Sequence, residues 1–262
     1  MALKNTSTHK ALSLLKQVGM HHEQGIRLKE LIEATGLDKS TAHRLLGCLV
    51  DEGFVEPIAS TKLYRLGVES MQLGFSSANM APLVDRFRPL MLKIARLTED
   101  SVFLVVRSGD MAVCVHREEG NYPVKVFLLA PGTRRLLGMS AVGLSILAHE
   151  TDDAIARLYA RHNLSYAQIG ITLKRLRQLI AATRQQGFSE VSDFVLEQTA
   201  GVGYATHISA ATQIGVSIAA ISARMPQKRR LELGHMLRDE VDAFVRATHP
   251  QAPASLTGAA TH

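Results

Sequence analysis

Residues 28–55 read LKELIEATGLDKSTAHRLLGCLVDEGFV, and this stretch decides the fold of the N-terminal part of the chain. The spacing of its apolar residues predicts a helix from about Leu28 to Thr35 and a second helix from about Lys39 to Glu52. Gly36 is suited to end the first helix in a left-handed conformation, and Asp38 is suited to cap the second. Two helices joined by so short a turn are typical of a helix-turn-helix.

The second helix has two faces of different chemistry. Its buried stripe is formed by four residues at i, i+3, i+4 and i+7, namely Ala42, Leu45, Leu46 and Leu49. The opposite face and the N-terminal end are polar and are expected to contact DNA; they comprise Lys39, Ser40, Thr41, His43, Arg44 and Gly47. Hydroxyl groups at a helix N-terminus bind phosphates, long polar side chains reach base edges, and glycine permits close approach. The alternative is a protein-binding module whose polar face is only solvated.

A short hairpin is predicted directly after this helix. The runs FVEP (54–57) and KLYRL (62–66) alternate like paired strands. Lys62, Tyr64 and Arg65 would then form a wing that touches the DNA backbone or the minor groove. Residues 1–80 hold nine Lys and Arg against eight Asp and Glu, although the whole chain carries +6. DNA binding by this part must therefore depend on where its charges lie.

The rest of the chain alternates between β-rich and helical patterns. Strand-like runs occupy residues 101–117, 122–130, 201–209 and 214–223, and helical patterns occupy 67–80, 82–97, 136–149, 152–161, 172–186 and 226–248. This order predicts an α+β fold with a domain boundary near residue 80. Cys48 and Cys114 are expected to be buried small apolar residues. We find no catalytic or metal-binding motif, signal peptide or membrane span, and expect a cytoplasmic protein without cofactor or metal.

The run DKSTAHRLLGCLVDEGFVE (38–56), followed by KLYRLG (62–67), closely resembles the N-terminal motif of the IclR (isocitrate lyase regulator) family of transcriptional regulators. That family shows a K-S-T-x-x-R-L-L core and a Y-x-L-G wing, which both occur here, and between them an E-x-G-[FY]-[VL]-E step, which occurs here with Asp51 in place of its first glutamate. The likeness extends more weakly over about residues 9–225. It implies a winged helix-turn-helix over residues 1–66, a linker helix over 67–81 and a GAF-like effector-binding domain over 82–248. The linker-like composition of residues 249–262 predicts a disordered tail.

The resemblance also implies a function. Such a protein would be a ligand-responsive DNA-binding regulator of a catabolic operon, a homodimer or homotetramer that binds double-stranded operator DNA and a small organic acid. The alternative from another class is a metabolic enzyme or an interaction module with an appended helical domain. The missing catalytic motif speaks against an enzyme.

The resemblance places the effector pocket under the helix that starts near Leu137. The family pattern L-H-C-T-A-x-G-K corresponds here to residues 137–143, from which its His, Cys and Lys are absent. An acidic family position corresponds to Asp193, for which a turn or cap residue is the alternative. The predicted effector-binding residues are Phe127, Arg134, Met139, Ser140, Ala141, Val142, Asp193, Gly203, Tyr204, Ala220 and Ser222.

These departures from the family pattern predict the kind of ligand. Gly203 and Ala220 stand where the family often supplies polar side chains, and Phe127, Met139 and Tyr204 are expected to add apolar walls. We therefore expect an aromatic carboxylate, with a short keto acid such as glyoxylate or pyruvate as the alternative. Arg134 or Arg135 is the predicted partner of its carboxylate, unless both lie in a surface turn.

Overall fold

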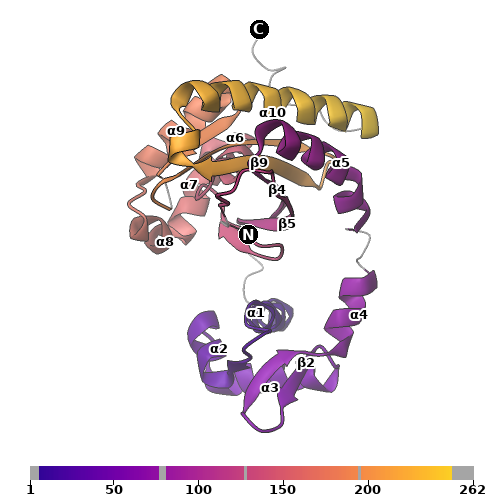
Figure 1. Cartoon of the computed structure of the whole chain (residues 1–262). Helices are drawn as coiled ribbons and strands as arrows, with labels where there is room; N and C mark the ends of the chain where they lie inside the picture. The colour runs from indigo at the N-terminus through magenta and orange to yellow at the C-terminus, as the bar shows by residue number, and fades with distance from the viewer. Residues whose placement is uncertain (1–5, 77–80, 127–128, 194–195, 250–262) are drawn as a thin grey trace. The chain divides into compact units, whose positions relative to one another are not determined.

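The chain forms two compact units, Met1–Pro82 and Leu83–His262. The structure is a computed structural model that describes residues 6–76, 81–126, 129–193 and 196–249. Figure 1 labels many of the helices and strands of both units.

The first unit is a winged helix-turn-helix. Its elements are α1 (Ser7–Met20), β1 (Ile26–Arg27), α2 (Leu28–Thr35), α3 (Lys39–Asp51), β2 (Val55–Ile58), β3 (Leu63–Leu66) and α4 (Val68–Ser76). The predicted caps are in place, because Gly36 ends α2 with a φ of 67° and the Asp38 carboxylate accepts a hydrogen bond from the Thr41 N–H at 2.8 Å. The core gathers apolar residues of α1, α2, α3 and the small sheet: Leu14, Val18, Ile26, Leu31, Leu45, Leu46 and Val55.

The wing contains a strand that the sequence did not predict. The two-residue strand β1 pairs antiparallel with β3, so that the sheet order is β1-β3-β2. Gly25 precedes β1 with a φ of 72°, and a Cβ on it would lie 2.9 Å from the Leu63 Cβ. The close approach of this segment to the wing therefore requires glycine.

The second unit begins within α5 (Ala81–Thr98) and is built on a six-stranded antiparallel sheet. Its strands are β4 (Ser101–Ser108), β5 (Met111–Glu118), β6 (Arg134–Leu136), β7 (Ser189–Ser192), β8 (Thr199–His207) and β9 (Gln213–Ile221), in the order β6-β5-β4-β9-β8-β7. Its other helices are α6 (Ala141–Ala148), α7 (Asp152–Arg161), α8 (Asn163–Gln168), α9 (Leu173–Gln186), the short η2 (Ser222–Arg224) and α10 (Gln227–Thr248).

Helices cover both faces of this sheet. On one face, α5 and α10 run along the strands (Figure 1), and Phe87, Ile94 and Val241 pack against Val102 and Leu104. The other face carries α6 with α7, α8 and α9 around a second core. Because side chains alternate along a strand, Phe103 and Val105 lie on the face opposite to Val102 and Leu104. The mixture of helices and antiparallel strands confirms the predicted α+β class.

Several predictions about local structure were wrong. The apolar run at residues 122–130 forms no strand in its described part; instead Val126 and Leu129 cover Phe103 and Cys114. The predicted helix over 136–149 begins only at Ala141, because Leu136 ends β6 and Gly138 turns the chain with a φ of 85°. The sequence also gave no signal for the short elements α8 and β7.

The two cysteines have different environments. Cys114 is buried, and burial raises the pKa of its thiol to about 11. Cys48 is exposed on α3, so the expectation that both are buried was wrong for Cys48. The α3 stripe that packs into the core passes through Leu45 and Leu46 and leaves Cys48 outside it.

Two features are absent from the described residues. None of the helices there combines the length and apolar character that a membrane span requires. In the same residues, no three His, Cys, Asp or Glu side chains come together as a possible metal site.

Candidate functional site

The exposed face of α3 carries the residues predicted to read DNA. Ala42, Leu45 and Leu46 are buried in the core of the unit, whereas His43 and Arg44 are exposed. A Cβ added to Gly47 would meet no other atom within 4 Å. Packing inside the unit therefore does not require glycine at this position.

The N-terminus of α3 already binds a carboxylate. Asp38 Oδ1 accepts hydrogen bonds from the Ser40 hydroxyl at 2.7 Å and from the Thr41 N–H at 2.8 Å. These bonds, the one from Ser40 above all, hold the pKa of Asp38 well below its ordinary value. A phosphate can only accept hydrogen bonds, so Ser40 has to leave Asp38 before it can donate to one. The phosphate contact of Ser40 remains a prediction, and it requires that Ser40 first give up its hydrogen bond to Asp38.

The wing presents its predicted DNA contacts unevenly. Lys62 and Arg65 are exposed, whereas Tyr64 is half-buried and packs against the core. Arg65 already forms an ion pair with Glu56 on the neighbouring strand. The structure thus places Tyr64 and Arg65 on β3 and Lys62 in the turn before it, and the Lys62 side chain forms no ion pair or hydrogen bond with another described residue.

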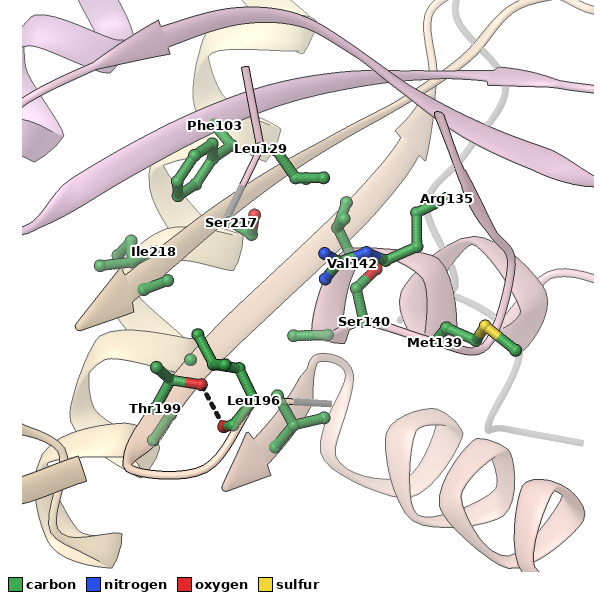
Figure 2. Close-up of a pocket in the computed structure, with 15 residues that line it drawn as sticks. Phe103, Leu129, Arg135, Met139, Ser140, Val142, Leu196, Thr199, Ser217 and Ile218 are labelled. Atoms are coloured by element: carbon green, nitrogen blue, oxygen red, sulfur yellow. Dashed lines mark hydrogen bonds between the residues drawn. The ribbon is translucent and has the colours of Figure 1, made fainter. Parts of the chain in front are cut away.

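The second unit contains a pocket between the sheet and the start of α6. Its walls are mostly apolar and are formed by Phe103, Leu129, Arg135, Met139, Ser140, Ala141, Val142, Val191, Leu196, Thr199, Ala200, Gly201, Ser217, Ile218 and Ala219. The cavity volume is about 50 Å³. Figure 2 shows the sheet residues Phe103 and Ser217 on one side and the first turn of α6 on the other.

Four lining residues have polar side chains. Ser140 accepts a hydrogen bond from the Gly143 N–H at 3.1 Å and caps α6, and the Thr199 hydroxyl donates to the Leu196 carbonyl at 2.6 Å. Ser217 is only 8% exposed, and its hydroxyl forms no hydrogen bond with any described residue. Arg135 reaches from β6 toward Ser140 (Figure 2). Burial lowers the pKa of its guanidinium, which nevertheless stays protonated in proteins.

Of the two arginines considered for the ligand carboxylate, Arg135 lines the pocket and Arg134 does not. They are neighbours on β6, so their side chains point to opposite faces. Arg134 is exposed and donates to the Ser108 hydroxyl at 3.0 Å. The structure therefore corrects the placement of Arg134 in the pocket.

The strand residues predicted for the pocket lie elsewhere. Tyr204 and Ala220 belong to the core under α5 and α10, on the far face of the sheet, and the Tyr204 hydroxyl donates to Asp242 at 2.6 Å. The same alternation places Ser217 and Ala219 in the pocket lining. Neither residue was predicted from the sequence, and the alternation along β9 was the available signal.

Gly203 is on the pocket side of the sheet but leaves no space for a ligand. A Cβ on it would lie 2.5 Å from the Val142 N and 2.7 Å from the Ala141 carbonyl carbon. The missing side chain allows the first turn of α6 to lie directly on β8.

Asp193 and Ser222 form a small network beside the pocket and do not line it. Asp193 accepts hydrogen bonds from the Ser192 hydroxyl at 2.9 Å, the Gln198 N–H at 2.7 Å and the Ser222 hydroxyl at 3.1 Å. These contacts, that with Ser192 first, lower the pKa of Asp193. Asp193 thus holds the backbone at Gln198, directly before the pocket residue Thr199. Phe127, which was predicted to line the pocket, lies outside the described residues.

Comparison with known proteins gives consistent matches for both units. Residues 7–58 match the IclR helix-turn-helix domain, and residues 75–246 match the family described as bacterial transcriptional regulator IclR C-terminal. The chain is 28% identical over 243 residues to the HTH-type transcriptional regulator KipR of Bacillus subtilis, and the alignment covers 91% of this chain and 95% of that protein.

Solved structures share the fold along most of the chain. An IclR family transcriptional regulator from Brucella abortus matches with a TM-score of 0.79 at 18% identity, covering 94% of this chain and 96% of that one. An IclR homolog from Microbacterium hydrocarbonoxydans matches with a TM-score of 0.65 at 17% identity, covering 92% of this chain and 100% of that one.

Proposed function

Because this chain belongs to the IclR family of bacterial transcriptional regulators, which are not enzymes, we propose that it controls a catabolic operon in response to a small organic acid. An aromatic carboxylate is the first candidate for this effector. The observation that carries the proposal is that the cationic Arg135 faces a mostly apolar pocket together with Ser217, whose hydroxyl has no hydrogen-bond partner among the described residues.

The carboxylate of the ligand would bind at the α6 end of the pocket. Arg135 supplies a positive charge there, and a guanidinium binds a carboxylate through two parallel hydrogen bonds. The first turn of α6 adds the partial positive charge of a helix N-terminus. Residues 139–142, all predicted from the sequence, surround this end.

The opposite part of the pocket is suited to an apolar body with one polar atom. Phe103, Leu129 and Ala219 form apolar walls, and Ser217 can donate a hydrogen bond to a substituent or accept one from it. The Microbacterium hydrocarbonoxydans homolog was solved in complex with 4-hydroxybenzoate, which supports this class of ligand by analogy.

A short keto acid such as pyruvate or glyoxylate is the second candidate. The cavity volume of about 50 Å³ favours it, because each water already needs about 10–15 Å³ measured in this way. An aromatic ring would have to move lining side chains such as Leu196, which is 52% exposed and borders the pocket.

Calorimetric titration of the full chain separates the two candidates. Benzoate, 4-hydroxybenzoate, pyruvate and glyoxylate are titrated into the wild type and into the variants Arg135→Met and Ser217→Ala. We expect the aromatic acids to bind more tightly, Arg135→Met to abolish binding of every acid, and Ser217→Ala to affect 4-hydroxybenzoate more than benzoate. Tighter binding of pyruvate or glyoxylate would overturn the aromatic proposal, and unchanged binding to Arg135→Met would overturn the role of Arg135.

The DNA-binding part of the proposal has its own test. We expect salt-dependent binding to the DNA upstream of the protein's own gene, with an affinity that the effector changes by about 5- to 150-fold. Absence of DNA binding at all salt concentrations would contradict operator recognition by α3 and the wing.

We further propose that the protein acts as a homodimer or homotetramer. Three apolar side chains of α4 are more than half exposed in the single chain: Val68, Met71 and Leu73. A second copy would cover them. Analytical ultracentrifugation is expected to show a dimer or tetramer that Met71→Glu weakens, and a monomeric wild type would contradict this proposal.

A further inference from the structure

A basic groove crosses the first unit between the wing and the start of α2. It has a volume of about 730 Å³ and is lined by Arg27, Leu28, Lys29, His43, Pro57, Ile58, Ala59, Thr61, Lys62 and Tyr64. We propose that this groove holds the sugar-phosphate backbone of one DNA strand, with Arg27, Lys29 and Lys62 as phosphate contacts. This inference rests on the proposed function, since it assumes that the unit binds DNA.

The charge of the groove matches a polyanion. Arg27, Lys29 and Lys62 line it, and none of the described lining residues is acidic. Neither Arg27 nor Lys62 forms an ion pair with a described residue. Lys29 has only a 3.9 Å contact with Glu33, and such exposed pairs contribute little. The cations are therefore available to an outside partner.

The acidic residues nearest in sequence do not neutralise Arg27. The Glu30 carboxylate accepts a hydrogen bond from the Arg27 backbone N–H at 2.8 Å, which caps α2. This contact uses the main chain of Arg27 and leaves its guanidinium unpaired among the described residues. The cap holds the backbone of Arg27 while its side chain remains exposed.

The short strand β1 explains why the cations converge. In its pairing with β3, Arg27 lies directly opposite Leu63, the residue after Lys62. Residues far apart in the sequence thus become neighbours on one edge of the groove. No signal in the sequence predicted β1, so the side of the groove that Arg27 forms was not expected.

The backbone of Lys62 provides a second, independent indication. Lys62 has a φ of 56°, in the left-handed region where glycine is favoured and other residues are strained. A glycine would form this turn at lower cost. Strain that is retained at such a position indicates a use for the side chain, and in this groove that use is binding an anion.

The groove also adjoins the predicted reading face. His43 lines it from α3 and belongs to the face predicted to contact bases. When a recognition helix lies in the major groove, the preceding helix crosses the backbone. A strand held in this groove would therefore flank the bases that α3 reads, and its contacts would add affinity without reading sequence.

The salt dependence of binding to a mixed-sequence duplex tests this inference without a known operator. The slope of log affinity against log salt is negative, and each lost phosphate contact lowers its magnitude by about 0.9. We expect Arg27→Ala and Lys62→Ala each to lower it by about this amount per subunit, and the triple variant that includes Lys29→Ala to lower it further. Arg27→Lys and Lys62→Arg should keep the wild-type slope, and Lys16→Ala on α1 is the matched control outside the groove.

A second measurement separates backbone contacts from base reading. The ratio between the affinities for the protein's own upstream DNA and for the mixed-sequence duplex is expected to stay constant in Arg27→Ala and Lys62→Ala. If wild-type slopes persist in the alanine variants, with thermal unfolding unchanged, the groove does not hold the backbone. If the wild type binds no DNA, the proposed function fails instead, so the two failures are distinguishable.

Discussion

Arg65 on β3 and Glu56 on β2 form an ion pair across the wing, with 2.5 Å between Arg65 Nε and Glu56 Oε1. The two residues lie directly opposite each other in the antiparallel pair. Their side chains are 50% and 43% exposed, so the pair contributes little to folding. If Arg65 contacts DNA as proposed, Glu56 competes with DNA for it.

Replacing Glu56 should therefore strengthen DNA binding. In Glu56→Gln, Arg65 keeps its charge and loses its ionic partner, so we expect the negative slope of log affinity against log salt to become steeper by about 0.9 for the gained phosphate contact. The free energy of unfolding should fall by no more than about 1 kcal/mol. Fluorescence anisotropy with labelled duplex at several salt concentrations measures the first effect, and urea unfolding the second.

The control for this prediction removes the same charge elsewhere. Glu23 is exposed in the loop before β1 and forms no ion pair with a described residue. Glu23→Gln should raise the affinity much less than Glu56→Gln. Equal gains from both variants would show that only net charge matters and that Arg65 does not contact DNA.

Arg44 provides a test of base reading by α3. It is exposed on the face opposite to the core, next to His43. We expect Arg44→Ala to weaken binding to the upstream DNA by about 1–3 kcal/mol and to reduce its preference over mixed-sequence DNA. A gel-shift titration with both duplexes measures both effects. Unchanged affinity would remove Arg44 from the reading face, and an equal loss on both duplexes would make it a phosphate contact.

Gly47 allows folding and binding to be separated. Its Cβ position is empty within the unit, so Gly47→Ala should leave the fold intact and stabilise α3 by up to about 1 kcal/mol. If DNA approaches α3 closely here, the added methyl group will weaken binding although the protein is more stable. Thermal unfolding and anisotropy on the same preparation measure both. Wild-type binding by Gly47→Ala would show that DNA stays away from this position.

The DNA-binding unit was largely predictable because its signals are local. Gly36 and Asp38 set helix ends by their own conformational preferences, and the stripe through Leu45 and Leu46 follows from helical periodicity. The strand β1 was not predictable, since two residues at Ile26–Arg27 carry no periodicity. Its existence depends on pairing with a wing that lies far along the chain.

The effector pocket was predictable on its helix side and not on its strand side. Residues 139–142 were placed from a continuous motif and line the pocket. Gly203 and Tyr204 were assigned to the same pocket although neighbours on a strand point to opposite faces. The pairing of β8 with β9 determines which of these two residues points toward α6. Ser217 was missed for the same reason.

Gly203 should be indispensable for the second unit to fold. A Cβ here would overlap backbone atoms of Val142 and Ala141, which cannot move as a side-chain end can. We expect Gly203→Ala to lower the free energy of unfolding by about 1–3 kcal/mol or more. Gly47→Ala, whose Cβ position is open, is the control in denaturant unfolding. A fully stable Gly203→Ala would mean that α6 can shift away from β8 without cost.

Tyr204 tests on which face of the sheet the ligand binds. Its hydroxyl donates to the buried Asp242 under α10, on the far side from Ser217. Tyr204→Phe removes that donor, so we expect the free energy of unfolding to fall by about 1–3 kcal/mol while the affinity for the effector is kept. Ser217→Ala should do the opposite, with unchanged stability and weaker binding of a hydroxylated acid. Calorimetry measures the affinity of both variants for the effector, and urea unfolding measures their stability. A ligand that contacted Tyr204 would reverse the expected pattern, so that Tyr204→Phe would bind it more weakly and Ser217→Ala would not.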